Sequence, residues 1–467
     1  QRCCSLEHFL LVCFLNFFAL FLVFLKMDSE YDAIVLGTGL KECILSGLLA
    51  LNGKKILHLD RRDYYGGDSA SVNLAKLYDL ARKSENFQQI GRARDWNIDL
   101  IPKFILANGV LVKLLAHTGV ANYMNFKLVE GSYVYKSGQL YKVPSNEEEA
   151  LSTSLMGFFQ KRRFRTFLEF VSGFDFQNKE TWGDVLPDST TMAEVYESFG
   201  LDENTIDFTG HALALYLDDD YLHKPCGETI RRINLYRDSI AKYGKSPYIY
   251  PVYGLGELPQ GFSRLAALHG GIFMVNKPVD KVIMQDGVAV GICSGGEIAK
   301  ARCIVGDPSY FPGRISKFGQ VIRCICVLSH ALPGTDESLS CQIIFPQNQV
   351  NRKSDIYICL VSDTHKVAAK GKYLAMVSTT AETSSPEEEL KPALDLLGEI
   401  DEKFVFVTDL FEPNDDGSDS KIFISKSYDP TTHFETTCTD IISLYERITG
   451  EKFDLSSVKR EVKDEEE

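Results

Sequence analysis

The stretch that decides the fold is YDAIVLGTGLKECILSGLLALNGKKILHLD, residues 31–60. It consists of an apolar run, a glycine turn, a segment with apolar residues three and four positions apart, and a second apolar run ending at Asp60. This order predicts a buried strand, a helix and a second buried strand, which together form a β-α-β unit. The fold class is therefore predicted to be α/β.

The glycine turn has the spacing of a dinucleotide-binding fingerprint. Gly37 and Gly39 open the turn, and Asp60 follows about twenty residues later, where such folds carry the acid that binds a ribose. The third glycine of the fingerprint is replaced by Glu42, which adds bulk and negative charge near the helix N-terminus. The pattern is thus a degenerate one.

A second acid weakens the case for a cofactor further. The Gly66-Gly67 doublet resembles the one that amine-oxidase-type flavoproteins follow with an arginine, but here Asp68 follows it. Two carboxylates beside a diphosphate are unfavourable by roughly 4 kcal/mol per pair at 4 Å and intermediate dielectric. We therefore predict that the flavoprotein-like fold is kept and that the cofactor, FAD or NAD, is absent.

The rest of the chain predicts a mixed-sheet body with an inserted all-helical domain. Short alternating strands are expected at 271–275, 281–284, 288–293 and 303–305, whereas residues 147–242 carry helix-period apolar faces. The predicted domains are a body of residues 27–145 plus 244–450, a helical insert of residues 146–243, and an acidic tail of residues 451–467. Residues 9–25 are almost wholly apolar, so we expect residues 1–26 to be absent from a working protein that starts at Met27, with a membrane anchor as the alternative.

Charge and cysteine usage exclude several function classes. Fifty Lys and Arg against sixty-four Asp and Glu give a net charge of -14, which argues against a nucleic-acid partner. The twelve cysteines form no C-x-x-C pair, so no metal site is indicated; Cys324 and Cys326 are expected to pack on one strand face. His211 lies in an apolar segment and is expected to be a satisfied core residue. With no hydrolase motif in the chain, we predict that it is not an enzyme.

Five long stretches carry a specific resemblance. They are GRARDWNIDLIPKFILANG (91–109), IDFTGHALALY (206–216), YGKSPYIYPVYGLGELPQGFSRL (243–265), PQNQVNRKSDIY (346–357) and SYDPTTHFETT (427–437). These stretches resemble Rab GDP dissociation inhibitors, and the similarity runs from Met27 to the acidic tail. The resemblance implies a non-enzymatic monomer that forms a 1:1 complex with GDP-bound, geranylgeranylated Rab GTPases. Such a protein slows GDP release, extracts Rabs from membranes and recycles them in vesicle traffic, and it is cytosolic with transient membrane contact.

The resemblance also implies site residues. The Rab-binding platform would include Tyr65, Glu257, Arg264 and Met274. The helical insert would hold the prenyl chain in a hydrophobic groove, with candidate walls Leu155, Met156, Phe159, Phe167 and Leu168.

Two alternatives stay open on the sequence. A Rab escort protein would share the platform and present Rabs to geranylgeranyl transferase, although escort proteins are usually longer. A FAD-dependent amine oxidase-like oxidoreductase would share the body. The absorption spectrum of the purified protein distinguishes the FAD-dependent oxidoreductase from a Rab GDP dissociation inhibitor and from an escort protein.

Overall fold

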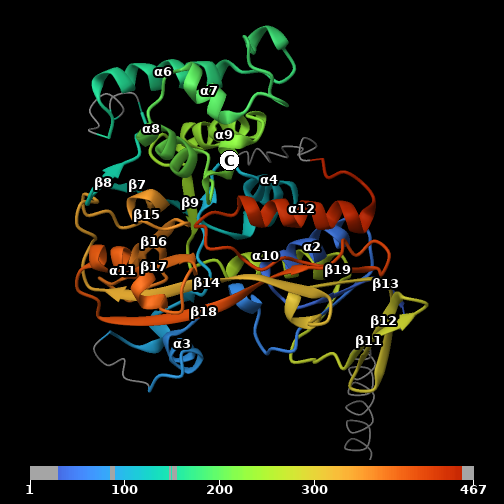
Figure 1. Ribbon diagram of the computed structural model, residues 1–467. Helices are drawn as coiled ribbons and strands as arrows, with labels where there is room; N and C mark the ends of the chain where they lie inside the picture. Colours follow the sequence, from blue (N-terminus) through green and yellow to red (C-terminus); the bar gives the residue numbers. More distant parts are fainter. Residues whose placement is uncertain (1–29, 85–89, 147–148, 150–154, 455–467) are drawn as a thin grey trace, which may run out of the picture.

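The protein, as a computed structural model, is described over residues 30–84, 90–146, 149 and 155–454 (Figure 1). Its first sheet has the strand order β10 (Ile272–Met274), β2 (Ile56–Leu59), β1 (Glu30–Leu36), β13 (Glu297–Gly306), β12 (Val288–Ser294) and β11 (Lys281–Gln285), with β19 (Ile422–Ile424) also paired to β13. β10, β2, β1, β13 and β19 run parallel to one another, whereas β12 is antiparallel to both of its neighbours, β13 and β11. The expected β-α-β unit is β1, α2 (Leu40–Leu51) and β2, and the four expected strands of the second half are found as β10 to β13.

The first sheet is covered on both faces, as the continuous apolar run of β1 requires. On one face, α2 packs with α10 (Glu257–Leu268), α12 (Glu435–Thr449) and α4 (Val110–His117) around a large core (Figure 1). On the other face, a smaller core that includes Ile34, Leu57 and Ile292 fills the space beneath β11 and β12. Side chains that alternate along a strand therefore enter two different cores.

A second sheet forms the other half of the body. Its order is β18 (Glu402–Pro413), β14 (Ile315–Leu328), β17 (Tyr373–Thr380), β16 (Ile356–Ser362), β15 (Cys341–Phe345), β7 (Gly131–Lys136) and β8 (Gln139–Lys142). Helix α11 (Pro386–Leu397) packs on it. Cys324 and Cys326 lie buried on one face of β14 with their Sγ atoms 3.5 Å apart, which confirms the expected packing.

Short elements connect the two sheets. The strand pairs are β3 (Ser71–Val72) with β4 (Ile98–Asp99), and β5 (Ile105–Leu106) and β6 (Phe126–Leu128) on either side of β9 (Tyr248–Pro251). The short helices are α3 (Leu74–Leu80), η1 (Gly67–Ser69), η2 (Ala93–Asp95), η3 (Val120–Tyr123), η7 (Pro308–Tyr310), η8 (Gln347–Gln349) and η9 (Asp363–His365).

The helices between β8 and β9 gather at the top of Figure 1 around a core of their own. They are α6 (Phe158–Gly173), η4 (Lys179–Thr181), α7 (Met192–Ser198), α8 (Glu203–Asp207), the π-helical η5 (Phe208–Leu213), η6 (Asp219–His223) and α9 (Gly227–Tyr243). Thr191 and Glu194 form a capping box at the start of α7, which satisfies backbone donors that the helix leaves free. We call this region the helical insert.

The structure leaves part of the sequence prediction unaddressed. Residues 1–26, 147–148, 150–154 and 455–467 lie outside the described residues, so the N-terminal extension and most of the acidic tail stay predictions. Of the helix expected from residue 147 onward, Glu149 is helical, residues 155–157 are not, and helix α6 begins at Phe158. The domain boundaries likewise remain a prediction.

Candidate functional site

The glycine loop lies between β1 and α2, as the sequence predicts. Gly37 has φ +95°, a left-handed conformation that favours glycine, and a Cβ atom there would collide with the Asp307 carboxylate. A Cβ atom at Gly39 would collide with the carboxylate of Glu42. The space left open by the missing side chains of Gly37 and Gly39 is therefore occupied by the carboxylates of Asp307 and Glu42.

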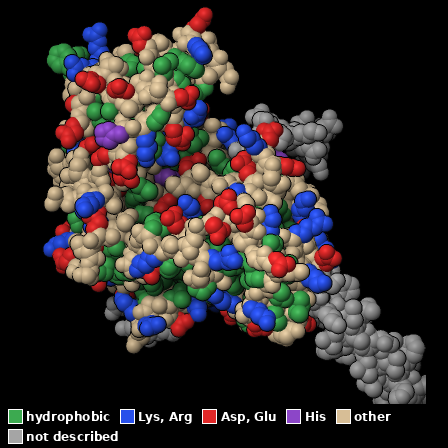
Figure 2. Space-filling view, turned by 45° about the vertical axis from the view of Figure 1, so that its right-hand side comes forward, with side chains coloured by type: hydrophobic (Ala, Val, Ile, Leu, Met, Phe, Trp, Pro, Cys, Tyr) green, Lys and Arg blue, Asp and Glu red, His purple; other side chains and the backbone are tan. Residues whose placement is uncertain are grey.

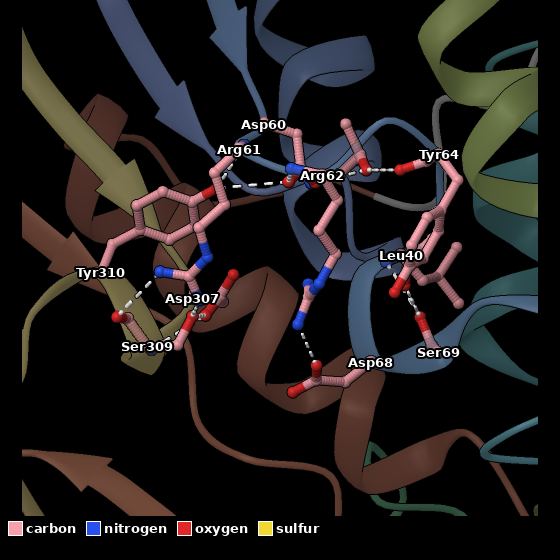
Figure 3. Close-up of polar contacts among 12 residues, drawn as sticks. Leu40, Asp60, Arg61, Arg62, Tyr64, Asp68, Ser69, Asp307, Ser309 and Tyr310 are labelled. Atoms are coloured by element: carbon pink, nitrogen blue, oxygen red, sulfur yellow. Dashed lines mark hydrogen bonds and ion pairs between the residues drawn. The ribbon is translucent and has the colours of Figure 1, made fainter. Parts of the chain in front are cut away.

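Asp60, the expected ribose-binding acid, is fully buried and satisfied by its own chain (Figure 3). One oxygen accepts hydrogen bonds from the backbone N–H and the hydroxyl of Thr38, at 2.7 and 2.6 Å. The other accepts from the backbone N–H of Arg62 at 2.8 Å and the hydroxyl of Tyr310 at 3.3 Å. A ribose hydroxyl would have to displace these donors, so Asp60 here acts as a structural tie between β2 and the loop.

A buried carboxylate, Glu42, and a half-buried one, Asp307, lie beside the glycine loop. Burial, and next the negative charge of Asp307, raise the pKa of Glu42 to about 8, against a 2.7 Å hydrogen bond from Ser425. Burial also raises the pKa of Asp307. Both shifts follow from placing acidic groups of like charge in a poorly solvated space.

Asp68 contributes less than the sequence suggests. Its side chain is 58% exposed, and Arg62 pairs with it at 2.7 Å (Figure 3). Solvent and Arg62 therefore screen much of its charge, although burial, and next Asp68, still raise the pKa of Asp307. The second acid beside the loop is the half-buried Asp307. The carboxylates of Glu42 and Asp307 lie against Gly39 and Gly37, where the backbone would have to approach a pyrophosphate, so the residues present do not fit FAD or NAD.

The predicted platform residues come from three elements around the same loop. Tyr65 follows β2 and lies against Phe273 of β10, with ring centroids 6.4 Å apart. Glu257 and Arg264 lie two turns apart on α10, and the Arg264 guanidinium stacks over the ring of Tyr123 at 4.5 Å. Ser263, next to Arg264, donates a 3.3 Å hydrogen bond to Cys43 of α2. Burial, and then Cys43, raise the pKa of Tyr65.

Met274 is separated from these residues by the sheet. Phe273 packs against the core beneath α2 and α10, whereas Met274 packs against the core on the opposite face. Successive side chains of a strand point to opposite faces, which explains the separation. Met274 is half-buried at an edge strand, and its place in a platform stays a prediction.

The five predicted prenyl-groove residues are distributed over three environments. Leu155 and Met156 pack against the large body core. Phe167 and Leu168 pack inside the helical insert. Phe159 is 77% exposed at the start of α6. The groove itself stays a prediction.

Two of the distinctive stretches meet at the junction of the insert and the body. His211 of η5 is buried, with its Nδ1 atom 2.7 Å from Asp355 and its Nε2 atom 3.1 Å from Asp219. Burial would lower the pKa of His211, but the two carboxylates outweigh it and raise the pKa to about 10. Gln347 and Asn348 donate to Asp219 and Asp207 across the same junction. His211 is satisfied as expected, and it also fastens the insert to the body.

A second buried pair joins two more of these stretches. Lys103 is fully buried, and its ammonium group contacts Asp429 at 2.7 Å and the hydroxyl of Thr431 at 2.9 Å. Burial would raise the pKa of Asp429, but the charge and hydrogen bond of Lys103 outweigh it and hold this pKa well below its usual value. The stretches that seemed merely characteristic in the sequence are therefore each other's partners.

Sequence reasoning missed Asp307, Phe273 and Tyr123. Asp307 follows β13, and the signal that could have revealed it is that β13 pairs directly with β1 at the end nearest the glycine loop. Phe273 is adjacent in the sequence to the predicted Met274, whereas Tyr123 meets the predicted Arg264 only in the folded chain. Among the residues that the structure places, no group of three or more His, Cys, Asp or Glu could hold a metal ion. Within the described ranges, no helix has the length and apolar character needed to cross a bilayer.

The fold and the loop together define a class of protein, a flavoprotein-like body whose dinucleotide loop is filled by its own carboxylates. An oxidoreductase from Methanosarcina mazei has the same fold, with a TM-score of 0.56 at 15% identity over 89% of this chain and all of that one. The family model described as GDP dissociation inhibitor matches residues 27–460, and the chain belongs to this family.

Closer relatives agree. Rab GDP dissociation inhibitor beta from Rattus norvegicus is 58% identical over 442 residues, 94% of this chain and 99% of the relative. The crystal structure of Rab GDI from Plasmodium falciparum matches with a TM-score of 0.88 and 49% identity, over 91% of this chain and 99% of that one.

Proposed function

We propose that this protein binds GDP-bound, prenylated Rab GTPases, slows their release of GDP and carries them between membranes through the cytosol. The observation that carries the proposal is the exposed stack of Arg264 on Tyr123, with Tyr65 and Phe273 as a second aromatic pair beside the glycine loop. Aromatic and arginine side chains of this kind are enriched at the centres of protein interfaces. The family membership and the 58% identical Rab GDP dissociation inhibitor support Rab as the partner.

The exposure of these groups supports an interface. Arg264 is exposed and Tyr123 is 45% exposed, although the two stack on each other. Tyr253, in the loop before α10, is 52% exposed with φ +75°, so its backbone is held in a conformation that side chains rarely adopt. Exposed aromatic groups fixed in this way can bind a partner without losing much conformational freedom.

The proposal assigns the prenyl lipid to the helical insert. Its aromatic core gives an apolar environment, in which each buried CH2 of a prenyl chain contributes about 0.8 kcal/mol. Leu155, Met156, Phe167 and Leu168 remain candidate walls. We expect a monomer that binds one Rab.

The decisive test measures binding of unprenylated, GDP-loaded Rab in solution. Arg264→Ala is expected to weaken binding by about 2 kcal/mol or more, roughly thirtyfold, because an interface arginine and its stacking on Tyr123 are lost. Arg302→Ala is the matched control, since Arg302 is 81% exposed on β13, away from α10. Equal affinity of Arg264→Ala and the unmutated protein would show that the platform is placed wrongly.

A second measurement separates the lipid role from the platform. Leu168→Asp is expected to reduce extraction of prenylated Rab from liposomes while leaving binding of unprenylated Rab within twofold. Circular dichroism must first show that this variant is folded. Extraction at the unmutated rate would remove Leu168 from the groove.

A further inference from the structure

The first half of α6 exposes two adjacent aromatic side chains. Phe158 is 80% exposed and Phe159 is 77% exposed, the highest values for large hydrophobic side chains among the described residues. Their ring centroids are 5.7 Å apart, edge to face. Two neighbouring phenylalanines in water are unfavourable, and such a pair marks a surface that meets an apolar phase or a partner.

The same helix has a conventional buried face, so this exposure is not a sign of poor packing. Phe167 and Val171 are 0% and 1% exposed and lie in the core of the helical insert. Phe164 packs on the same side, with its ring centroid 6.2 Å from that of Phe167. Phe158 and Phe159 therefore belong to a second apolar face at the outer end of the helix.

Basic side chains surround the aromatic pair. Residues 158–165 read FFQKRRFR and contain four basic and no acidic residues, although the whole chain has a net charge of -14. Arg162 and Arg165 are exposed, and Arg165 is bridged to Glu169 at 3.0 Å. Arg163 donates to the carbonyl of Gly200 at 2.9 Å, which holds it at the edge of the patch. In the space-filling view, hydrophobic and basic side chains lie side by side at the outer edge of the helical insert (Figure 2).

We propose that the first half of α6 docks on anionic membrane surfaces. Phe158 and Phe159 enter the boundary between headgroups and acyl chains, and Arg162 and its basic neighbours contact lipid phosphates and carboxylates. Phenylalanine next to Lys and Arg is the composition of helices that lie in a membrane interface, and positive charge complements an anionic leaflet. The rest of this acidic chain is repelled by such a surface, so the basic patch also fixes the orientation of docking.

This inference rests on the proposed function, because extraction requires the protein to meet the membrane. The surface that makes this contact is the first half of α6. Docking also places Phe159 in the membrane interface instead of the wall of a prenyl groove. Since α6 contributes Phe167 and Val171 to the insert core, docking brings that core next to the bilayer.

The test is flotation of the Rab-free protein with vesicles of phosphatidylcholine alone or with 30% phosphatidylserine, at low and at 0.15 M salt. It is run on the full chain and on residues 27–467, which include the whole family match, so that the apolar N-terminal segment cannot mask the result. The variants are Phe158→Ser with Phe159→Ser, and separately Arg162→Glu. Matched controls are Phe318→Ser, a 55% exposed aromatic residue on β14, and Arg302→Glu on β13.

We expect residues 27–467 to bind phosphatidylserine vesicles at least fivefold better than phosphatidylcholine vesicles. The double serine variant and Arg162→Glu should each lose binding at least fivefold, and the controls should stay within twofold of the unmutated protein. Absence of vesicle binding, equal binding to both vesicle types, or equal loss in the controls would overturn the proposal. Binding of unprenylated GDP-loaded Rab is measured in parallel, and its failure counts against the proposed function alone.

Discussion

Two largely buried pairs of titratable groups in the body, Lys103 with Asp429 and Glu42 with Asp307, differ in the signs of their charges. The first pair joins a cation and an anion, and the second joins two acids. The first joins opposite charges at 2.7 Å, and each group favours the ionised form of the other. The second places like charges in one space and raises the pKa of both acids. The Lys103–Asp429 pair fastens distant stretches together, whereas the Glu42 and Asp307 carboxylates fill the space beside Gly39 and Gly37.

The second pair shows how the chain itself can fill the space beside a glycine loop. A Gly-rich loop at a helix N-terminus leaves space beside its backbone donors for an anion, and here side chains of the chain itself fill that space. Glu42 and Asp307 are held by hydrogen bonds from Ser425 and Ser309. Four predictions can break or sharpen the comparison.

The largest expected effect is at Lys103. Lys103→Met should lower the free energy of unfolding by about 3–5 kcal/mol, because it leaves the Asp429 carboxylate buried without its cation. Urea denaturation monitored by circular dichroism measures the change. The matched control is Lys76→Met, which breaks the exposed pair with Asp79 and should cost under about 1 kcal/mol. Similar losses in the two variants would contradict the assignment of Lys103 as a buried tie.

The second largest loss of stability is expected at His211. His211→Asn is expected to cost about 2 kcal/mol, less than Lys103→Met because Asp355 keeps hydrogen bonds from Gln347 and Tyr357. The insert should loosen first, so hydrogen exchange should increase at η5 and η6 more than in the first sheet. Uniform exchange across both regions would show that His211 does not fasten the junction.

Glu42 is expected to make the free energy of unfolding depend on pH. Its pKa in the folded protein, about 8, lies above its usual value of 4.5. Between these two pH values, the folded state therefore keeps a proton that the unfolded state has released. This contribution to stability is present at low pH and is lost as the pH rises from about 4.5 to 8, at up to about 1.4 kcal/mol per pH unit.

Glu42→Gln removes that dependence, so its stability relative to the unmutated protein should increase between pH 5 and 8. Urea midpoints at several pH values measure the difference. A difference that is constant over this range would mean that Glu42 titrates normally.

The smallest effect is expected at Asp68. Asp68→Asn breaks the pair with Arg62, in which the Asp68 side chain is 58% exposed, and should change the free energy of unfolding by less than about 1 kcal/mol. Thermal denaturation at low and high salt checks this, with any loss shrinking as salt rises. A loss above 2 kcal/mol would place Asp68 with the buried acids.

The sequence by itself determined the β-α-β unit of residues 31–60, the later strands β10 to β13, and the replacement of a fingerprint glycine by Glu42. Hydrophobic periodicity and turn glycines are local, so a strand–turn–helix can be read from neighbouring residues. The resemblance of five stretches also identified the family. It could not tell that Lys103 pairs with Asp429, or that His211 pairs with Asp355, because those partners are brought together only by folding.

The tertiary structure decided which acids are buried and which core each side chain of a strand enters. Asp307 reaches Gly37 because β13 pairs with β1, and Asp68 turns to solvent and Arg62 although it is much closer to the loop in sequence. Phe273 and Met274 are adjacent in the chain but enter opposite cores, since a strand alternates its side chains. Burial and long-range neighbours set charge and exposure, and neither follows from spacing along the chain.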